Sequence, residues 1–211
     1  MLEDGTRLPL SSALSAAELA NLSLSPVAQV RAAVAAHPNT SPYILGLLAA
    51  EFPAEVLGNP ALPLLRLADP GLIFRWPAAS LLALVRQLDT PTWLRTQVSR
   101  HPNAELQVLL ASHPALTLEE MHNLRVHPSW LVRARLAARE DLPPALLQGL
   151  AEDTHYAVRL AVVSRANLTA DCLRDFLNDP SRFVRQEALR RTRTGERNTE
   201  SSGDGGHQQV E

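Results

Sequence analysis

Apolar residues recur three and four positions apart in short stretches along this chain, which is the spacing of one face of an α-helix. In residues 153–163, for example, Val158, Ala161 and Val162 fall on one such face. A breaker such as Pro, Asn or His-Pro ends each stretch, and a second, Leu-rich stretch follows. The pattern predicts pairs of short helices and an all-α fold.

A repeat of 26 residues organises the C-terminal half of the chain. Repeats of roughly 20 to 50 residues are typical of stacked helical arrays. The regular copies are residues 101–126, 127–152, 153–178 and 179–191, and less regular copies occupy 25–39, 69–77 and 89–103.

Six of these copies carry a Ser, Asp or His six positions before an arginine, while the copy 101–126 has Gln107 in place of the arginine. The pairs are Ser25 and Arg31, Asp69 and Arg75, Asp89 and Arg95, His127 and Arg133, Asp153 and Arg159, and Asp179 and Arg185. Asp and Ser accept hydrogen bonds from the free N–H groups of a helix start, so they are expected to be helix caps. Capping boxes are predicted at Ser15–Glu18 and Thr117–Glu120.

One helix pair cannot bury its apolar face alone, whereas stacked pairs share a continuous core. About seven to eight such units fit between residues 12 and 191. The predicted organisation is an N-terminal cap segment (1–24), an α-solenoid of helical repeats (25–191) and a tail (192–211). The tail is polar and glycine-rich, so it is expected to be disordered.

The segments SPVAQVRAAVAAHPN (25–39), GNPALPLLRLADP (58–70) and DTHYAVRLAVVSRANLT (153–169) resemble the leucine-rich repeat variant family and HEAT-like repeats. The resemblance covers most of residues 25–190 and implies a right-handed superhelix. The family's repeat is usually shorter than the one found here, so some second helices are expected to be closer to HEAT geometry. Some members bind an iron–sulfur centre through an N-terminal cysteine cluster, but this chain has only Cys172.

Composition narrows the range of functions. The formal net charge of -2 gives no global attraction for nucleic acid or an anionic membrane. One cysteine excludes an internal disulfide and a thiolate-built metal cluster, and no cofactor is expected. The absence of a membrane-length apolar run and of a signal-peptide layout predicts a cytoplasmic protein. All basic residues apart from histidine are arginine, which is typical of a GC-rich bacterial genome.

The repeated arginines allow two interpretations. Stacking would align them as an open basic stripe for phosphate or an acidic partner, or as a ladder in which each arginine pairs with an acid of its own or a neighbouring unit. HEAT-like repeats carry such a ladder, so the resemblance favours the second interpretation. The ladder would comprise Arg31, Arg75, Arg95, Arg133, Arg159 and Arg185 with Asp69, Asp89, Asp153 and Asp179.

A second group of arginines lies at the C-terminal end of the repeats. It consists of Arg182, Arg185, Arg190, Arg191 and Arg193, offset locally by Asp179 and Glu187. The group is either a contact for nucleic acid or an acidic partner, or the solvated face of an end helix. No aromatic residues alternate with these arginines in the way that base stacking would require.

Three tryptophans stand out in a chain with few aromatic residues. Trp76, Trp93 and Trp130 are either outward anchors for a partner or fillers of gaps between irregular units. With Asp69 or Asp89 they are also the only residues that would suit a HEAT-like DNA glycosylase. Otherwise no catalytic motif or metal-ligand spacing is present.

The sequence therefore predicts a non-enzymatic scaffold that binds a protein or peptide. The candidate contact residues are Trp76, Trp93, Trp130, Arg182, Arg185 and Arg190. The alternative is a solenoid that binds nucleic acid through an arginine-lined surface.

Overall fold

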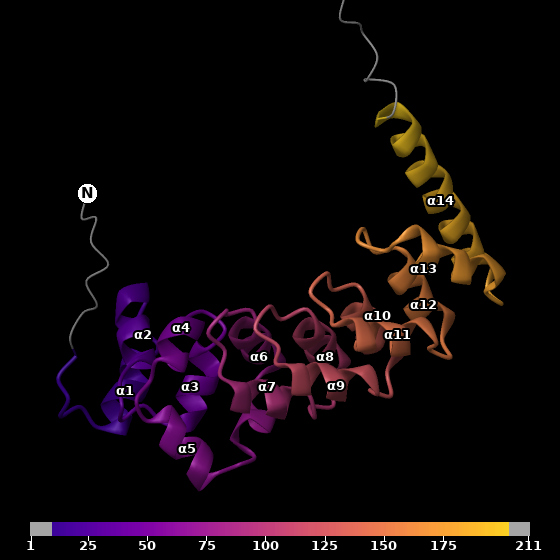
Figure 1. Ribbon diagram of the computed structural model, residues 1–211. Coiled ribbons are helices and arrows are strands. Elements are labelled where there is room, and N and C mark those ends of the chain that lie inside the picture. Colours follow the sequence, from indigo (N-terminus) through magenta and orange to yellow (C-terminus); the bar gives the residue numbers. More distant parts are fainter. Residues whose placement is uncertain (1–9, 203–211) are drawn as a thin grey trace, which may run out of the picture. The chain divides into compact units, whose positions relative to one another are not determined.

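The computed structural model describes residues 10–202, and the side chains of these residues as far as 194. Within this range the chain is all-α, with fourteen α-helices, two 3₁₀ helices and no strand (Figure 1). It forms two compact units, Met1–Ala115 (unit 1) and Leu116–Glu211 (unit 2). The all-α prediction is confirmed, while the right-handed superhelix and the number of repeats stay predictions.

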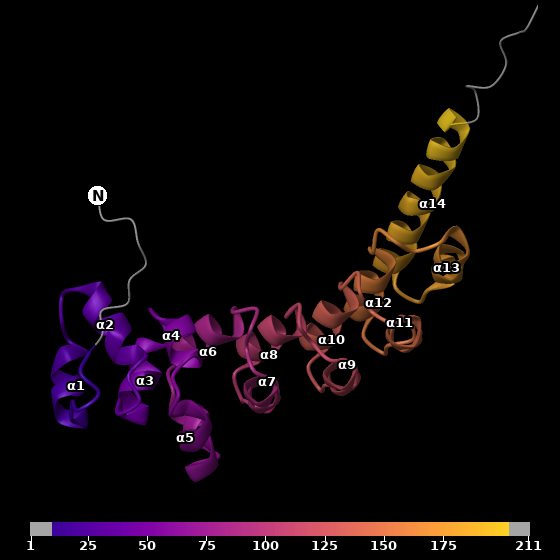
Figure 2. The same ribbon diagram turned by 60° about the vertical axis from the view of Figure 1, so that its left-hand side comes forward.

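Unit 1 contains eight α-helices and one 3₁₀ helix in its described part. Helices α2, α4, α6 and α8 contact one another in succession, and α1, α3 and α7 each contact a member of this row (Figure 2). The bounds are α1 Ala16–Leu22, α2 Ala28–Ala35, α3 Pro42–Leu48, α4 Pro53–Leu57, α5 Leu62–Ala68, η1 Leu72–Arg75, α6 Ala78–Val85, α7 Thr92–Val98 and α8 Ala104–Ala111.

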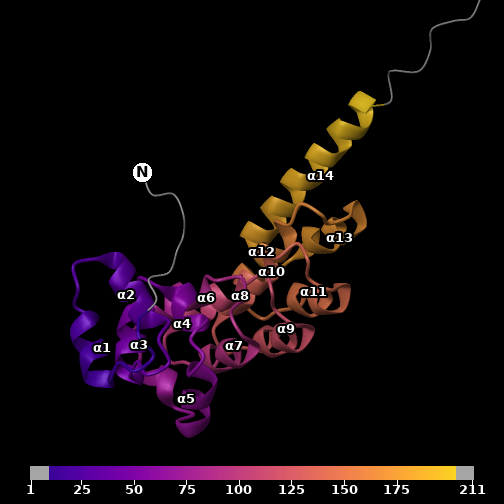
Figure 3. The same cartoon turned by 90° about the vertical axis from the view of Figure 1, so that its left-hand side faces the viewer.

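Unit 2 is built from two layers of helices (Figure 3). Helices α10, α12 and α14 stack in one layer, and α9, α11 and α13 lie against them in the other. The bounds are α9 Leu118–Arg125, α10 Trp130–Ala137, α11 Pro144–Ala151, α12 Tyr156–Val163, α13 Ala170–Asp175, η2 Phe176–Asn178 and α14 Arg182–Ser202.

The core of unit 2 follows the repeat. The apolar residue directly before each ladder arginine, Val132, Val158 or Val184, is fully buried between the stacked helices. Gly149 lets α11 approach α9, because a Cβ atom there would lie 2.6 Å from Nη1 of Arg125. The absence of a side chain at Gly149 thus leaves room for the Arg125 guanidinium between the two helices.

Local capping explains where several helices begin. The two predicted capping boxes, Ser15–Glu18 and Thr117–Glu120, are confirmed. The predicted Asp caps are wrong in detail, because they lie two residues before the N-cap. Asp153 accepts a hydrogen bond from the N–H of His155 at 2.8 Å, and His155 is the N-cap of α12. The carboxylate thus closes a turn ahead of the helix.

The C-terminal segment differs from the prediction. Helix α14 continues to Ser202, where a disordered tail was expected from residue 192. Its first turns are anchored in unit 2, so each further residue extends an existing helix without the cost of nucleation. Residues 1–9 and 203–211 lie outside the described part. No helix among residues 10–202 is both long enough and apolar enough to cross a lipid bilayer.

Candidate functional site

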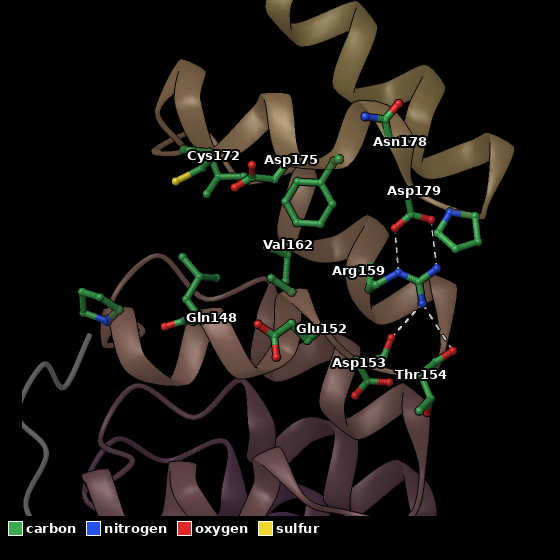
Figure 4. Close-up of a pocket in the computed structure, with 16 residues that line it drawn as sticks. Gln148, Glu152, Asp153, Thr154, Arg159, Val162, Cys172, Asp175, Asn178 and Asp179 are labelled. Carbon is green, nitrogen blue, oxygen red and sulfur yellow. Dashed lines mark hydrogen bonds and ion pairs between the residues drawn. The ribbon is translucent and has the colours of Figure 1, made fainter.

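The arginine ladder of unit 2 joins successive repeats. Nε and Nη2 of Arg133 donate to the two carboxylate oxygens of Asp153 at 2.6 and 3.0 Å. Arg159 holds Asp179 in the same way at 2.7 and 2.9 Å (Figure 4). Each arginine also donates through Nη1 to a carbonyl of its own repeat, as Arg159 does to Asp153 at 2.7 Å. We call each such Arg–Asp pair a rung of the ladder, and each rung ties one repeat to the next.

These rungs are largely shielded from water. The side chain of Asp179 is 5% exposed and that of Arg159 is 13% exposed. Hydrogen bonds from Arg159 lower the pKa of Asp179 more than burial raises it. Burial likewise acts to raise the pKa of Asp153, but hydrogen bonds from Arg133 and His155 outweigh it and the pKa is lowered. Both carboxylates therefore stay ionised and occupied.

Unit 1 contains one rung of the same pattern, more exposed than those of unit 2, and one looser pair. Arg31 donates to Glu51, an acid that the sequence analysis did not select, and to the Ser25 carbonyl at 2.7 Å. Arg75 pairs with Asp69 of its own repeat, and both side chains are substantially exposed. This rung holds no neighbouring repeat.

Two predicted members of the ladder behave differently. Arg95 is buried and donates to the Thr90 carbonyl at 2.5 Å and to the Thr92 hydroxyl at 3.1 Å. Asp89 is exposed and has no hydrogen-bond partner among the described residues. The spacing explains the difference, because Asp89 follows the preceding ladder arginine, Arg75, by only fourteen residues, whereas the acid of a filled rung follows its arginine by twenty. The prediction of Asp89 as a ladder acid is therefore wrong.

A second series of contacts, missed in the sequence analysis, also spans one repeat. Arg165 donates to the carbonyls of Ala137 and Arg139, and Arg191 donates to those of Val163 and Arg165. These carbonyls lie at the ends of α10 and α12, where helices leave carbonyls without intrahelical partners. The spacing of 26 residues between Arg165 and Arg191 was the available signal.

An open pocket of about 910 Å³ lies between α11 and α13 of unit 2 (Figure 4). Its lining includes the apolar side chains of Leu147, Val162, Leu168 and Phe176. We call it the α11–α13 groove. The volume is within the range of about 300 to 1,000 Å³ that is usual for ligand-binding pockets.

The charged residues that line the α11–α13 groove are four acids and one arginine. Glu152 lies on the α11 wall and Asp175 on the α13 wall, and neither has an ion-pair partner among the described residues (Figure 4). Asp153 and Asp179 also line the groove, but the ladder arginines occupy their oxygens. Cys172 is exposed at its edge. The free charge that the groove offers a ligand is therefore negative.

The three tryptophans have three different environments. Trp76 is 6% exposed and donates through Nε1 to the Pro42 carbonyl at 3.1 Å, so the prediction of an outward anchor is wrong for it. It fills space over Gly46, where a Cβ atom would lie 2.5 Å from the indole ring. Trp93 is half-buried with Arg66 over its ring at 5.0 Å. Trp130 is 39% exposed.

Trp130 begins a row of exposed rings on unit 2. It stacks on His155 with ring centroids 4.4 Å apart, and Tyr156 follows at 5.2 Å from His155. Phe183 continues the row 5.8 Å from Tyr156, and the guanidinium of Arg182 lies over Phe183 at 4.8 Å. The rings contact one another in sequence, yet Trp130, Tyr156 and Phe183 each remain 39–46% exposed.

The arginine cluster at the C-terminal end is partly paired. Arg190 forms two hydrogen bonds to Glu187, at 2.8 and 2.5 Å, and Arg191 is engaged with carbonyls as described. Arg182 is exposed apart from its contact with Phe183. Arg185 donates through Nη1 to the carbonyls of Asp179 and Pro180. Of the three predicted contact residues, Arg182 and Arg185 thus retain donors for a partner.

Within the described residues, no three His, Cys, Asp or Glu side chains come together in a way that could hold a metal ion. The histidines that precede proline have structural contacts, and Nε2 of His37 and of His113 each meets a carbonyl 26 residues earlier. Nδ1 of His101, for example, accepts the N–H of Asn103 at 3.1 Å. Comparison of the chain with protein-family models, curated proteins and solved structures found no match.

Proposed function

We propose that this protein is a helical-repeat scaffold that binds a peptide segment of another protein in the α11–α13 groove. The segment inserts an apolar side chain between Leu147 and Phe176 and places a lysine or arginine beside it. The observation that carries the proposal is the pairing of an apolar lining with two unpaired carboxylates, Glu152 and Asp175.

The apolar and the charged residues of the groove contribute to peptide binding in different ways. Apolar groups gain about 25 cal/mol for each Å² that a partner removes from water. The two carboxylates favour a cationic side chain and raise the rate of association. Their effect on affinity is smaller. The rungs hold the neighbouring walls in place, so a partner does not have to order the groove when it binds.

Nucleic acid is the weaker candidate for this site. The arginines of the filled rungs are engaged by carboxylates, and the unpaired charges in the groove are negative, which repels phosphate. Competition between an oligonucleotide and a bound peptide would reveal binding of nucleic acid at this site.

Selection of random twelve-residue peptides against the full chain tests the proposal. The selected peptides should share an apolar residue next to lysine or arginine. The variant Glu152→Lys/Asp175→Lys should lose their binding, because it reverses both free charges. Glu119→Lys, at an exposed acid of α9 outside the groove, is the matched control and should bind as the wild type does.

Three outcomes would contradict the proposal. The first is failure to enrich any peptide. The second is binding that survives charge reversal in the groove. The third is saturable binding of a DNA or RNA oligonucleotide that competes with the selected peptides.

A further inference from the structure

The arginine ladder stops at Arg185 with half of a rung in place. Arg185 is anchored like Arg159, because its Nη1 donates to the carbonyls of Asp179 and Pro180 at 2.5 and 3.0 Å. Arg159 then holds a carboxylate with Nε and Nη2. No carboxylate among the described residues meets these two nitrogens of Arg185. Nε and Nη2 of Arg185 are thus held in place by the Nη1 contacts, but no carboxylate of the described chain accepts hydrogen bonds from them.

The described part of the chain does not return to fill this rung. In the complete rungs, α10 and α12 end after eight residues, and the chain turns back so that an acid twenty residues beyond the arginine reaches it. Helix α14 instead runs without a break for 21 residues. The described part of this helix therefore supplies no carboxylate to Nε and Nη2 of Arg185.

The surface around Arg185 combines apolar groups with positive charge. Leu189, which follows Arg185 by four residues on the same face of α14, is 44% exposed. A shallow hollow of about 330 Å³ is lined by Leu189, Arg193 and three further α14 residues. In the preceding repeats the next helix of the layer packs against α10 and α12. No later helix among the described residues does this for α14.

We propose that this end of unit 2 docks the start of a helix from a partner protein, whose aspartate completes the Arg185 rung. This surface is separate from the α11–α13 groove, and its charge is opposite. In both filled rungs the acceptor Asp also takes the N–H two residues later, at 2.8 Å for Asp153 and 2.7 Å for Asp179. The partner's Asp therefore belongs to a turn that precedes a helix, with apolar residues that cover Leu189.

A second copy of this chain is a poorer occupant. Arg31 uses the Ser25 carbonyl as Arg185 uses that of Asp179, so Ser25 is the matching residue of the first repeat. A copy stacked in the repeat spacing would bring Ser25 to Arg185. A serine hydroxyl cannot replace a carboxylate that accepts two charged hydrogen bonds. The partner is consequently a protein of different sequence.

A labelled synthetic peptide with the sequence of residues 151–164 serves as the probe, since it carries an acceptor Asp and the helix start after it. Fluorescence anisotropy with the full chain measures its binding. We expect the peptide to bind roughly tenfold more tightly than its Asp153→Asn form, because charged hydrogen bonds are lost. The Arg185→Gln protein should remove this difference.

Two further variants keep the test decisive. Arg185→Lys preserves the charge and folding but lacks the bidentate edge, so it should also lose most of the preference for Asp. Arg174→Gln removes an exposed arginine of α13 that pairs with Asp171, and it should keep the preference. Circular dichroism checks that each variant is folded.

Several results would overturn the proposal. They are the absence of saturable binding, equal affinities for the Asp and Asn peptides, and an unchanged preference in Arg185→Gln. Competition by a single-stranded DNA 12-mer that depends on Arg185 would assign the surface to nucleic acid instead. Self-association of the full chain that is lost in Arg185→Gln would assign it to a second copy.

Discussion

The two units solve the same packing problem in different ways. In unit 2 the apolar residue before each ladder arginine is buried, and shielded rungs join one repeat to the next. Unit 1 is uneven. Leu94, before Arg95, is buried, and Arg31 reaches Glu51 twenty residues on. Phe74, however, is 42% exposed, and Arg75 pairs with an acid of its own repeat. Where the repeat is regular, the same Arg–Asp pair joins each repeat to the next. Where it is irregular, neighbouring repeats are held together by different contacts at each position.

Aromatic side chains supply those separate solutions in unit 1. Trp76 fills the space over Gly46, Phe74 stacks on His101 with centroids 5.6 Å apart, and Arg66 covers Trp93. Large rings suit this task because each buries much surface in one side chain. Unit 1 should therefore depend on single aromatic residues, and unit 2 on its rungs.

Replacement of Trp76 by alanine should have the largest effect on stability. The change empties a buried space and leaves the Pro42 carbonyl without its indole donor, so we expect a loss of about 3–5 kcal/mol in the free energy of unfolding. Urea unfolding followed by circular dichroism measures it. Trp130→Ala, at a 39% exposed ring of unit 2, should cost about 1 kcal/mol or less. Equal losses would refute the dependence of unit 1 on this residue.

Breaking a rung should have the next largest effect. Arg159→Gln leaves the Asp179 carboxylate nearly buried without its bidentate partner, and we expect a loss of about 3 kcal/mol. Arg75→Gln breaks the exposed pair of unit 1 and should cost about 1 kcal/mol or less. Urea unfolding gives both values, and hydrogen exchange should show faster opening of α12 and α14 only in the first variant. If both variants lost the same stability, the contrast between the units would not hold.

The 26-residue periodicity of the sequence was sufficient to predict the contacts that recur from one repeat to the next. The spacing from Asp153 to Asp179 and from Arg133 to Arg159 located the rungs, because equivalent residues of stacked repeats become neighbours. It did not reveal the turn that each Asp closes, since an Asp two residues before the N-cap resembles the cap itself in sequence. Propensity favours a cap at either position.

Features that depend on one particular packing contact were not predictable in this way. The burial of Trp76 follows from a glycine in α3, and no local pattern links the two residues. The α11–α13 groove follows from the separation of two helices whose sequences read like those of the other second helices. The pairing of Arg31 with Glu51 was missed because the acid is a Glu outside the six cap positions.

Acid should weaken unit 2 through its rungs, with a smaller effect than removal of an arginine. The pKa of Asp179 is lowered in the folded state, chiefly by hydrogen bonds from Arg159, and the pKa of Asp153 is lowered as well. A lowered pKa means that the rung stabilises the fold fully above the pKa of the unfolded chain, which is about 3.9 for Asp. That stability is lost as the pH falls through the lowered folded-state value.

Asp179→Asn should therefore flatten the dependence of the free energy of unfolding on pH below about pH 4, because one titrating carboxylate of the fold is gone. Urea unfolding between pH 2 and 7, read from circular dichroism, measures the slope. The control is the same substitution made in Arg159→Gln. Without the guanidinium that lowers the pKa, loss of the Asp179 carboxyl should change the slope less than it does in the wild type. An equal change in both backgrounds would show that Arg159 does not set the acid response of this rung.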